Sequence, residues 1–178
     1  MLRVNAISQM GEIMQEKMQF IPKSVHLGKS KRSILQVDDI LYTNAGTIGR
    51  VSIVDRALLP ANTNQAIAIV RPDKTKVDAD FLFMTMRQPE FQAELHFDIV
   101  HAVQANLALG KIAGAEAVFP PNDLLPQLFS PVRSILRKIW HNRAEASTVT
   151  ALRDTLLPKL LSGELRVPDA EKLAEAAL

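Results

Sequence analysis

LFSPVRSILRKIWHNRAEASTVTALRDTLLPKL, residues 128–160, carries apolar residues in alternating steps of four and three. This is the heptad period of a coiled coil. The heptad seam has ten positions, eight of them apolar: Leu128, Val132, Ile135, Ile139, Asn142, Ala146, Val149, Arg153, Leu156 and Leu160. Because one helix cannot bury such a seam against itself, the pattern predicts a partner helix from this chain, a second copy or another protein.

Prolines bound this helix on both sides. Pro120 and Pro121 are expected to end the preceding globular part, because proline removes a backbone donor and favours an extended chain. Pro131 is tolerated in a first helical turn, and Pro158 is expected to kink or end the helix. We therefore expect four parts: a globular domain at 1–119, a proline-rich linker at 120–126, a long helix at 127–162 and a frayed tail at 163–178.

The N-terminal part is predicted to be a β-rich α+β domain. Apolar residues at helical spacing predict a helix within residues 5–20. Short β-branched segments at 40–43, 48–54 and 66–70 predict the strands of a β-meander or half-barrel. Asp78 or Asp80 is expected to cap a helix, and Pro89 to open another. A loop at 101–114 and a short strand at 116–119 complete the prediction.

Composition limits the class of protein. The chain has 178 residues, 47% of them hydrophobic, and no cysteine, which fits a globular protein of a reducing compartment and excludes disulfides. Neither an export signal nor a run of about 18 apolar residues is present, so the sequence predicts a cytoplasmic protein without a membrane span.

Positive charge is concentrated in two zones, although the net charge is only +2. Residues 23–32 hold Lys23, Lys29, Lys31 and Arg32 and no acidic residue, and residues 127–166 hold seven lysines and arginines against three acidic residues. Such a zone is often only a solvated surface. The functional alternative is a surface for nucleic acid or for an acidic partner.

Catalysis and metal binding have little support in the sequence. His96 and His101 are five residues apart, so they do not share a helix face as a zinc-binding pair does. The chain has neither a GxSxG motif nor a cysteine nucleophile. The glycines of GTIGR, residues 46–50, lack the spacing of a phosphate-binding loop. The hypothesis that the chain is an enzyme therefore fails, because the sequence shows no convergent set of acid, base and nucleophile.

Polar residues gather on two predicted turns of the β-rich part. The first turn carries Asn44, Thr47 and Arg50, and the second is the run Asn62-Thr63-Asn64-Gln65. Asparagine, glutamine and arginine make bidentate contacts with base edges, and lysine and arginine hold phosphates. Asparagine and threonine are also ordinary turn formers, so these residues alone leave both interpretations open.

Five segments, in their order along the chain, resemble the specificity subunits of type I restriction-modification systems. They are DILYTNAGTIGRV (39–51), NQAIAI (64–69), QANL (104–107), FPP (119–121) and LLPKLLSGELRV (156–167). The resemblance covers about residues 15–168. It implies a target recognition domain that reads one half of a split DNA site, and a helix that packs antiparallel against its counterpart. It also implies a subunit that catalyses nothing and on which methyltransferase subunits dock.

The resemblance also implies partners and an assembly. Expected partners are double-stranded DNA, the methyltransferase subunits and, through them, the restriction subunit. S-adenosylmethionine and ATP would belong to those partners, so no cofactor is expected in this chain. One recognition domain and one helix imply a half subunit that forms a homodimer. The DIL…GTIG stretch begins near residue 39, earlier than in family members, so part of the recognition domain is expected to be missing.

The expected site residues follow from these patterns. Phosphate contacts are expected from Lys29, Lys31, Arg32 and Arg50, and base contacts from Asn44, Thr47, Asn62, Asn64 and Gln65. The dimer interface is expected at Leu128, Val132, Ile135, Ile139, Asn142, Ala146, Val149 and Leu156, and partner docking at Arg133, Arg137, Lys138 and Arg143. The alternative function is a structural adaptor that dimerises or binds the methyltransferase without reading DNA.

Overall fold

The structure, a computed structural model, describes residues 1–97, 106–120 and 124–175, and on helix α5 it leaves aside the side chains of residues 125–130, 133 and 144. The chain divides into two compact units, Met1–Phe129 and Ser130–Leu178. Every helix among these residues is too short or too polar to cross a bilayer.

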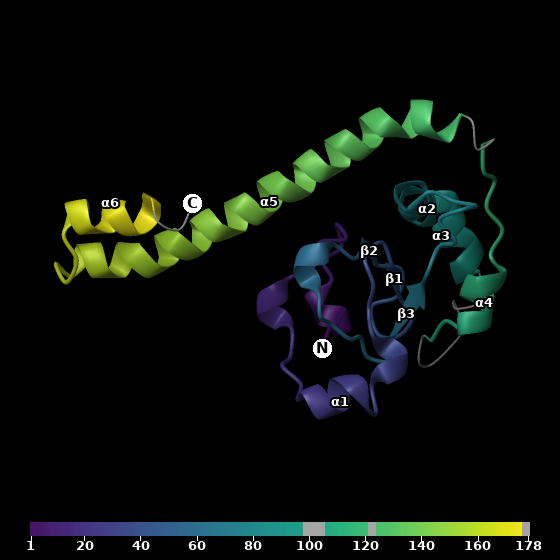
Figure 1. The fold of residues 1–178 in the computed structure, drawn as a ribbon, viewed down its shortest axis with the longest axis horizontal. Helices are drawn as coiled ribbons and strands as arrows, with labels where there is room; N and C mark the ends of the chain where they lie inside the picture. The colour runs from purple at the N-terminus through teal and green to yellow at the C-terminus, as the bar shows by residue number, and fades with distance from the viewer. Residues whose placement is uncertain (98–105, 121–123, 176–178) are drawn as a thin grey trace. The chain divides into compact units, whose positions relative to one another are not determined.

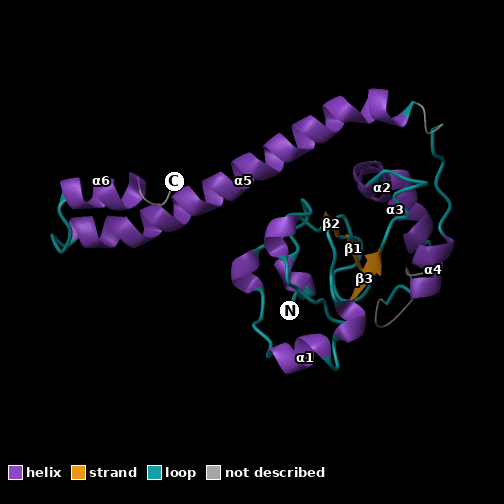
Figure 2. Cartoon of the chain, in the orientation of Figure 1, coloured by secondary structure: helices purple, strands orange, loops and turns teal. Residues whose placement is uncertain are grey.

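The described residues contain three strands, six α-helices and four 3-10 helices, joined by turns and irregular segments (Figures 1 and 2). The strands are β1 (Ile40–Thr43), β2 (Val51–Ile53) and β3 (Ile67–Val70). The α-helices are α1 (Lys23–Leu27), α2 (Ala79–Met86), α3 (Pro89–His96), α4 (Leu109–Gly114), α5 (Leu125–Leu161) and α6 (Val167–Glu175). The 3-10 helices are η1 (Val4–Ala6), η2 (Gln15–Lys17), η3 (Lys31–Ser33) and η4 (Arg56–Leu58).

The α+β class is confirmed, but the expected meander or half-barrel is wrong. The strands form one antiparallel sheet in the order β2-β1-β3, so β1 lies in the centre. A meander would place β2 in the centre. Here β3 pairs along the free side of β1, with Tyr42 opposite Ala68.

Both faces of β1 are covered, and all four of its residues are buried. Because side chains alternate along a strand, Leu41 lies on the opposite face to Tyr42. Leu41 belongs to a core cluster that includes Leu2, Ile7 and Val54. The Tyr42 hydroxyl instead donates to Oε1 of Gln92 on α3, at 3.0 Å. The N-terminal segment therefore covers one face of the sheet and α3 covers the other.

The helix expected within residues 5–20 is wrong. Gly11 has a φ of +82° and closes a turn in which its amide donates to the Ser8 carbonyl at 3.0 Å. A Cβ on Gly11 would lie 2.4 Å from the carbonyl oxygen of Val51, so this turn fits against β2 only with glycine. Ile7 then pairs with Ile13 in an antiparallel bridge. Of the residues that gave the apolar spacing, Ile7 and Met18 pack on the core, whereas Met10 is exposed.

Helices α2 and α3 begin where their capping signals predicted. The Asp78 side chain accepts from the amides of Asp80 and Phe81, and Pro89 is the first residue of α3. The loop expected at 101–114 is wrong over Leu109–Gly114, which forms α4; His101 lies outside the described residues. The strand expected at 116–119 is absent, and these residues have an irregular conformation.

Helix α5 is not ended by Pro158 and runs to Leu161, one residue short of the bound expected for the long helix at 127–162. Gly163, with a φ of +73°, ends the helix, and its amide donates to the Leu160 carbonyl at 3.2 Å. The frayed tail is also wrong, because the chain turns and forms α6, which runs back beside the last turns of α5 (Figure 1). Ala170 is buried on α6.

Candidate nucleic-acid interface

Residues 61–64 are held on both sides by other segments of the chain. On one side Leu2 pairs in parallel with Thr63, and the amide of Asn64 donates to the Leu2 carbonyl at 3.2 Å. On the other side Ile34 pairs antiparallel with Asn62. This pairing fixes the backbone that leads into Gln65, the first residue of the turn before β3.

The basic segment lies against the same backbone. Lys29 lies between α1 and η3, and Arg32 lies within η3. Both side chains are exposed, as is that of Lys31. The amide of Thr63 donates to the Ser33 carbonyl at 3.1 Å, which ties η3 to the polar run.

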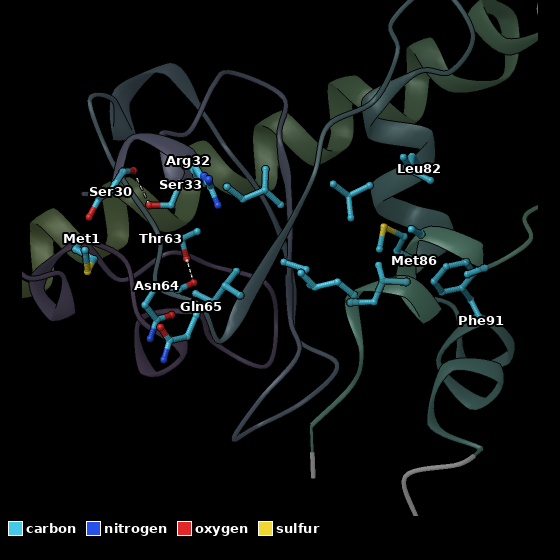
Figure 3. Close-up of a pocket in the computed structure, with 18 of the residues that line it drawn as sticks. Met1, Ser30, Arg32, Ser33, Thr63, Asn64, Gln65, Leu82, Met86 and Phe91 are labelled. Carbon is cyan, nitrogen blue, oxygen red and sulfur yellow. Dashed lines mark hydrogen bonds between the residues drawn. The ribbon is translucent and has the colours of Figure 1, made fainter. Parts of the chain in front are cut away.

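These two segments form one wall of an open groove of about 1160 Å³, the first groove (Figure 3). Its polar wall contains Lys29, Arg32, Asn64 and Gln65, and its apolar wall comes from β3, α2, α3, α4 and residues 115–119. None of the described residues that line it is acidic. The positive potential of this wall is therefore not offset by a lining carboxylate.

Asn62, one of the expected base contacts, is buried and hydrogen-bonded within the chain. Its side chain is 1% exposed, and its Nδ2 donates to the Ser30 carbonyl at 2.7 Å and to Oγ of Ser33 at 3.4 Å. Its Oδ1 accepts from Nδ1 of His26. A side chain with these bonds is unavailable to a base edge, so Asn62 holds the basic segment against the polar run.

The first predicted turn lies away from this groove. Asn44 is buried, and its Nδ2 donates to the Leu107 carbonyl at 3.4 Å, so it is also excluded as a base contact. Thr47 is exposed and Arg50 half-buried, and both line a second cavity of about 420 Å³. The fold thus gathers Lys29, Arg32, Asn64 and Gln65 but separates them from Thr47 and Arg50.

The second cavity also contains residues that the sequence analysis did not single out for binding. Arg87 follows α2, and Gln92 and His96 lie on α3. Nε2 of His96 lies 3.2 Å from the Tyr42 hydroxyl, and burial raises the pKa of Tyr42 to about 12. No local motif links these residues to Thr47, because only the docking of α3 on the β1–β2 turn brings them together.

Apolar side chains of the heptad seam are exposed within this chain. Ile135 is 61%, Ile139 39% and Val149 47% exposed, and Asn142 and Ala146 are exposed as well. Val132, Leu156 and Leu160 are half-buried. The side chains of Leu128 and Arg133 lie outside the description. Arg137 and Lys138, off the seam, are exposed, and Arg143 is half-buried.

Among the residues that the structure describes, no group of three histidine, aspartate or glutamate side chains could hold a metal ion. The buried carboxylate of Asp39, at the start of β1, is paired with the Arg71 guanidinium through contacts of 2.7 and 2.8 Å. Asp39 thus has a structural role at strand entry.

Comparison with known proteins finds similar specificity subunits, although no family model matches the chain. The type I restriction enzyme HindI specificity subunit of Haemophilus influenzae is 31% identical over 136 residues, 75% of this chain and 28% of that protein. The EcoBI specificity subunit of Escherichia coli is 27% identical over 162 residues, 87% of this chain and 33% of that protein. This chain is a homologue of type I restriction enzyme specificity subunits.

Two solved structures share its fold. The HsdS subunit from Thermoanaerobacter tengcongensis matches with a TM-score of 0.54 over 89% of this chain and 40% of that chain. A chain from a type I restriction-modification complex matches with a TM-score of 0.58 over 94% of this chain and 43% of that one. Both are 13% identical to it. Specificity subunits of these systems are non-catalytic. The homologue described here spans about a third of the length of the curated relatives given above.

Proposed function

We propose that this specificity-subunit homologue binds double-stranded DNA through the polar wall of the first groove. The observation that carries the proposal is the convergence of Lys29 and Arg32 with Asn64 and Gln65, some 35 residues apart in sequence, on one acid-free wall. The two cations have the chemistry to hold phosphates, and the two amides have the chemistry to read base edges. Lys31, exposed beside them on η3, supplements the phosphate contacts.

The proposal includes assembly through α5. Ile135, Ile139 and Val149 of the heptad seam are exposed to solvent. Burial of each such large side chain by a partner helix would contribute about 1.5–3 kcal/mol of free energy. We therefore propose that α5 pairs antiparallel with a second copy, about a centre near Ala146. The methyltransferase subunit would dock on the basic residues Arg137 and Lys138, and through it the chain would join the restriction subunit. S-adenosylmethionine and ATP chemistry would lie in those partners.

Salt-dependent binding to duplex DNA tests the groove. The full chain is titrated into a labelled random duplex at several salt concentrations, and the slope of log affinity against log salt counts the phosphate contacts. Lys29→Ala with Arg32→Ala removes two contacts and lowers the magnitude of the slope by about 1.8. The matched control is Lys17→Ala with Arg56→Ala, which removes two exposed cations that line neither cavity.

An unchanged slope in the groove variant contradicts the proposal. A wild-type chain that shows no DNA binding, but still self-associates and co-purifies with a methyltransferase subunit, would instead support the structural adaptor.

A further inference from the structure

The apolar wall of the first groove has large side chains that face solvent. Four of its apolar residues are already buried in the fold: Ile67, Met86, Phe91 and Ile112. Two others are exposed, Leu109 at 60% and Phe119 at 41%. The Phe119 ring packs against the Phe81 ring, with centroids 5.3 Å apart. Leu109, the first residue of α4, is therefore the large apolar side chain of this wall that is most open to a ligand.

Leu109 is tied to the segment of Gln65 by two backbone hydrogen bonds. The amide of Asn44 donates to the Ala66 carbonyl at 3.0 Å, and the amide of Leu107 donates to the Asn44 carbonyl at 2.7 Å. Asn44 thus joins the residue after Gln65 to a residue two positions before Leu109. The exposed amide of Gln65 and the exposed Leu109 side chain therefore line the same groove from neighbouring segments.

These two side chains have the chemistry to recognise an A·T pair. A glutamine amide makes bidentate contact with N6 and N7 of adenine, and an apolar side chain contacts the 5-methyl group of thymine. The major-groove edge of an A·T pair carries both features. We propose that Leu109 contacts the 5-methyl group of a thymine in or next to the base pair that Gln65 reads. This inference rests on the proposed function, because it requires a duplex in the first groove.

The charges of the groove favour DNA over an apolar protein segment as its occupant. Lys29 and Arg32 are exposed on the polar wall, and none of the described residues that line the groove is acidic. An apolar protein segment would leave these cations without a counter-charge. In a duplex, by contrast, the base edges lie between two phosphate backbones, so cations and base-reading side chains are satisfied by the same ligand.

The competing explanation is that Leu109 has no partner, because single exposed apolar residues are common on protein surfaces. Leu109→Ala distinguishes the two. The side chain is 60% exposed and alanine favours a helix, so the fold should tolerate the change. The matched control is Leu27→Ala on α1, which shortens a leucine that is 54% exposed and lines neither cavity.

The test removes the methyl group from the DNA. A preferred duplex is selected from a random pool with the full chain, and each thymine in it is replaced in turn by uracil, which lacks only the 5-methyl group. In the wild type and in Leu27→Ala, one of these replacements should weaken binding about fourfold, as expected for one buried methyl group. In Leu109→Ala, thymine and uracil at that position should bind equally, within about 1.5-fold.

Equal affinity of the wild type for every uracil duplex would overturn the inference, and so would a preferred duplex without thymine. A thymine preference that Leu109→Ala leaves unchanged would also overturn it, because the methyl contact would then belong to another residue. In each of these cases the proposed function stands if Lys29→Ala with Arg32→Ala still lowers the salt slope. A chain that binds no duplex at all would refute both the proposed function and this inference.

Discussion

Replacing Asn62 separates a structural role from a base-reading role. Asn62→Ala removes the bonds from Nδ2 to the Ser30 carbonyl, at 2.7 Å, and from His26 to Oδ1. Two such bonds at about 1–1.5 kcal/mol each give a loss of about 2–3 kcal/mol of local stability. The loss falls on the contact between the basic segment and the polar run, because Asn62 bridges the two.

Hydrogen exchange measures this loss where it occurs. The amide of Leu35 donates to the Ala61 carbonyl at 3.0 Å and that of Thr63 to the Ser33 carbonyl at 3.1 Å, so both report on the contact. We expect their exchange to accelerate by about 30- to 150-fold in Asn62→Ala. Asn64→Ala, beside it on the groove wall, should change exchange by about twofold or less. Unchanged exchange in Asn62→Ala, with an altered DNA sequence preference, would refute the structural role.

Three further predictions concern assembly, pH and docking. Ile139→Glu should leave the fold intact and weaken self-association about 100-fold or more, because the two copies each lose about 1.5 kcal/mol or more of burial free energy. Sedimentation equilibrium measures this change. A wild-type chain that is monomeric at about 50 µM would contradict pairing through the heptad seam. Burial raises the pKa of Tyr42 to about 12, above its ordinary value of 10, so the folded state retains the proton longer than the unfolded state. The free energy of unfolding should therefore fall as pH rises from about 10 to 12, and it should fall by up to about 3 kcal/mol more in the wild type than in Tyr42→Phe. Denaturant unfolding at a series of pH values measures it, and parallel pH profiles of the two proteins would contradict this prediction. Charge reversal of Arg137 and Lys138 should abolish co-purification with a methyltransferase subunit while leaving dimerisation intact, and retained co-purification counts against docking there.

Local signals in the sequence were sufficient for the central elements of the fold. The β-branched run at Ile40–Thr43 predicted β1, and Asp78 and Pro89 predicted the starts of α2 and α3, because caps and strand propensities act within a few residues. The heptad pattern likewise predicted α5. Its end at Leu161 lies within one residue of the expected bound, just before Gly163, which has a left-handed conformation, and the helix is not ended by Pro158.

Other features depend on contacts that no local pattern encodes. The irregular path near Gly11 follows from its packing on the Val51 carbonyl, 40 residues away. Asn62 and Asn64 are alike in sequence context, and the bonds of Asn62 to His26, Ser30 and Ser33, with the burial that accompanies them, distinguish the structural residue from the groove residue. Residue chemistry therefore predicted candidate contacts, and the tertiary fold decided which of them share a surface.

Sequence selection from a random duplex pool tests the central claim most directly. The wild-type chain, with its methyltransferase subunit present, is compared with Gln65→Ala, which shortens an exposed amide on the groove wall, and with Gln15→Ala, an exposed amide that lines neither cavity. If the groove reads bases, Gln65→Ala relaxes the preference at one position by about 1–3 kcal/mol and Gln15→Ala leaves it unchanged. An identical preference in all three proteins would contradict the account.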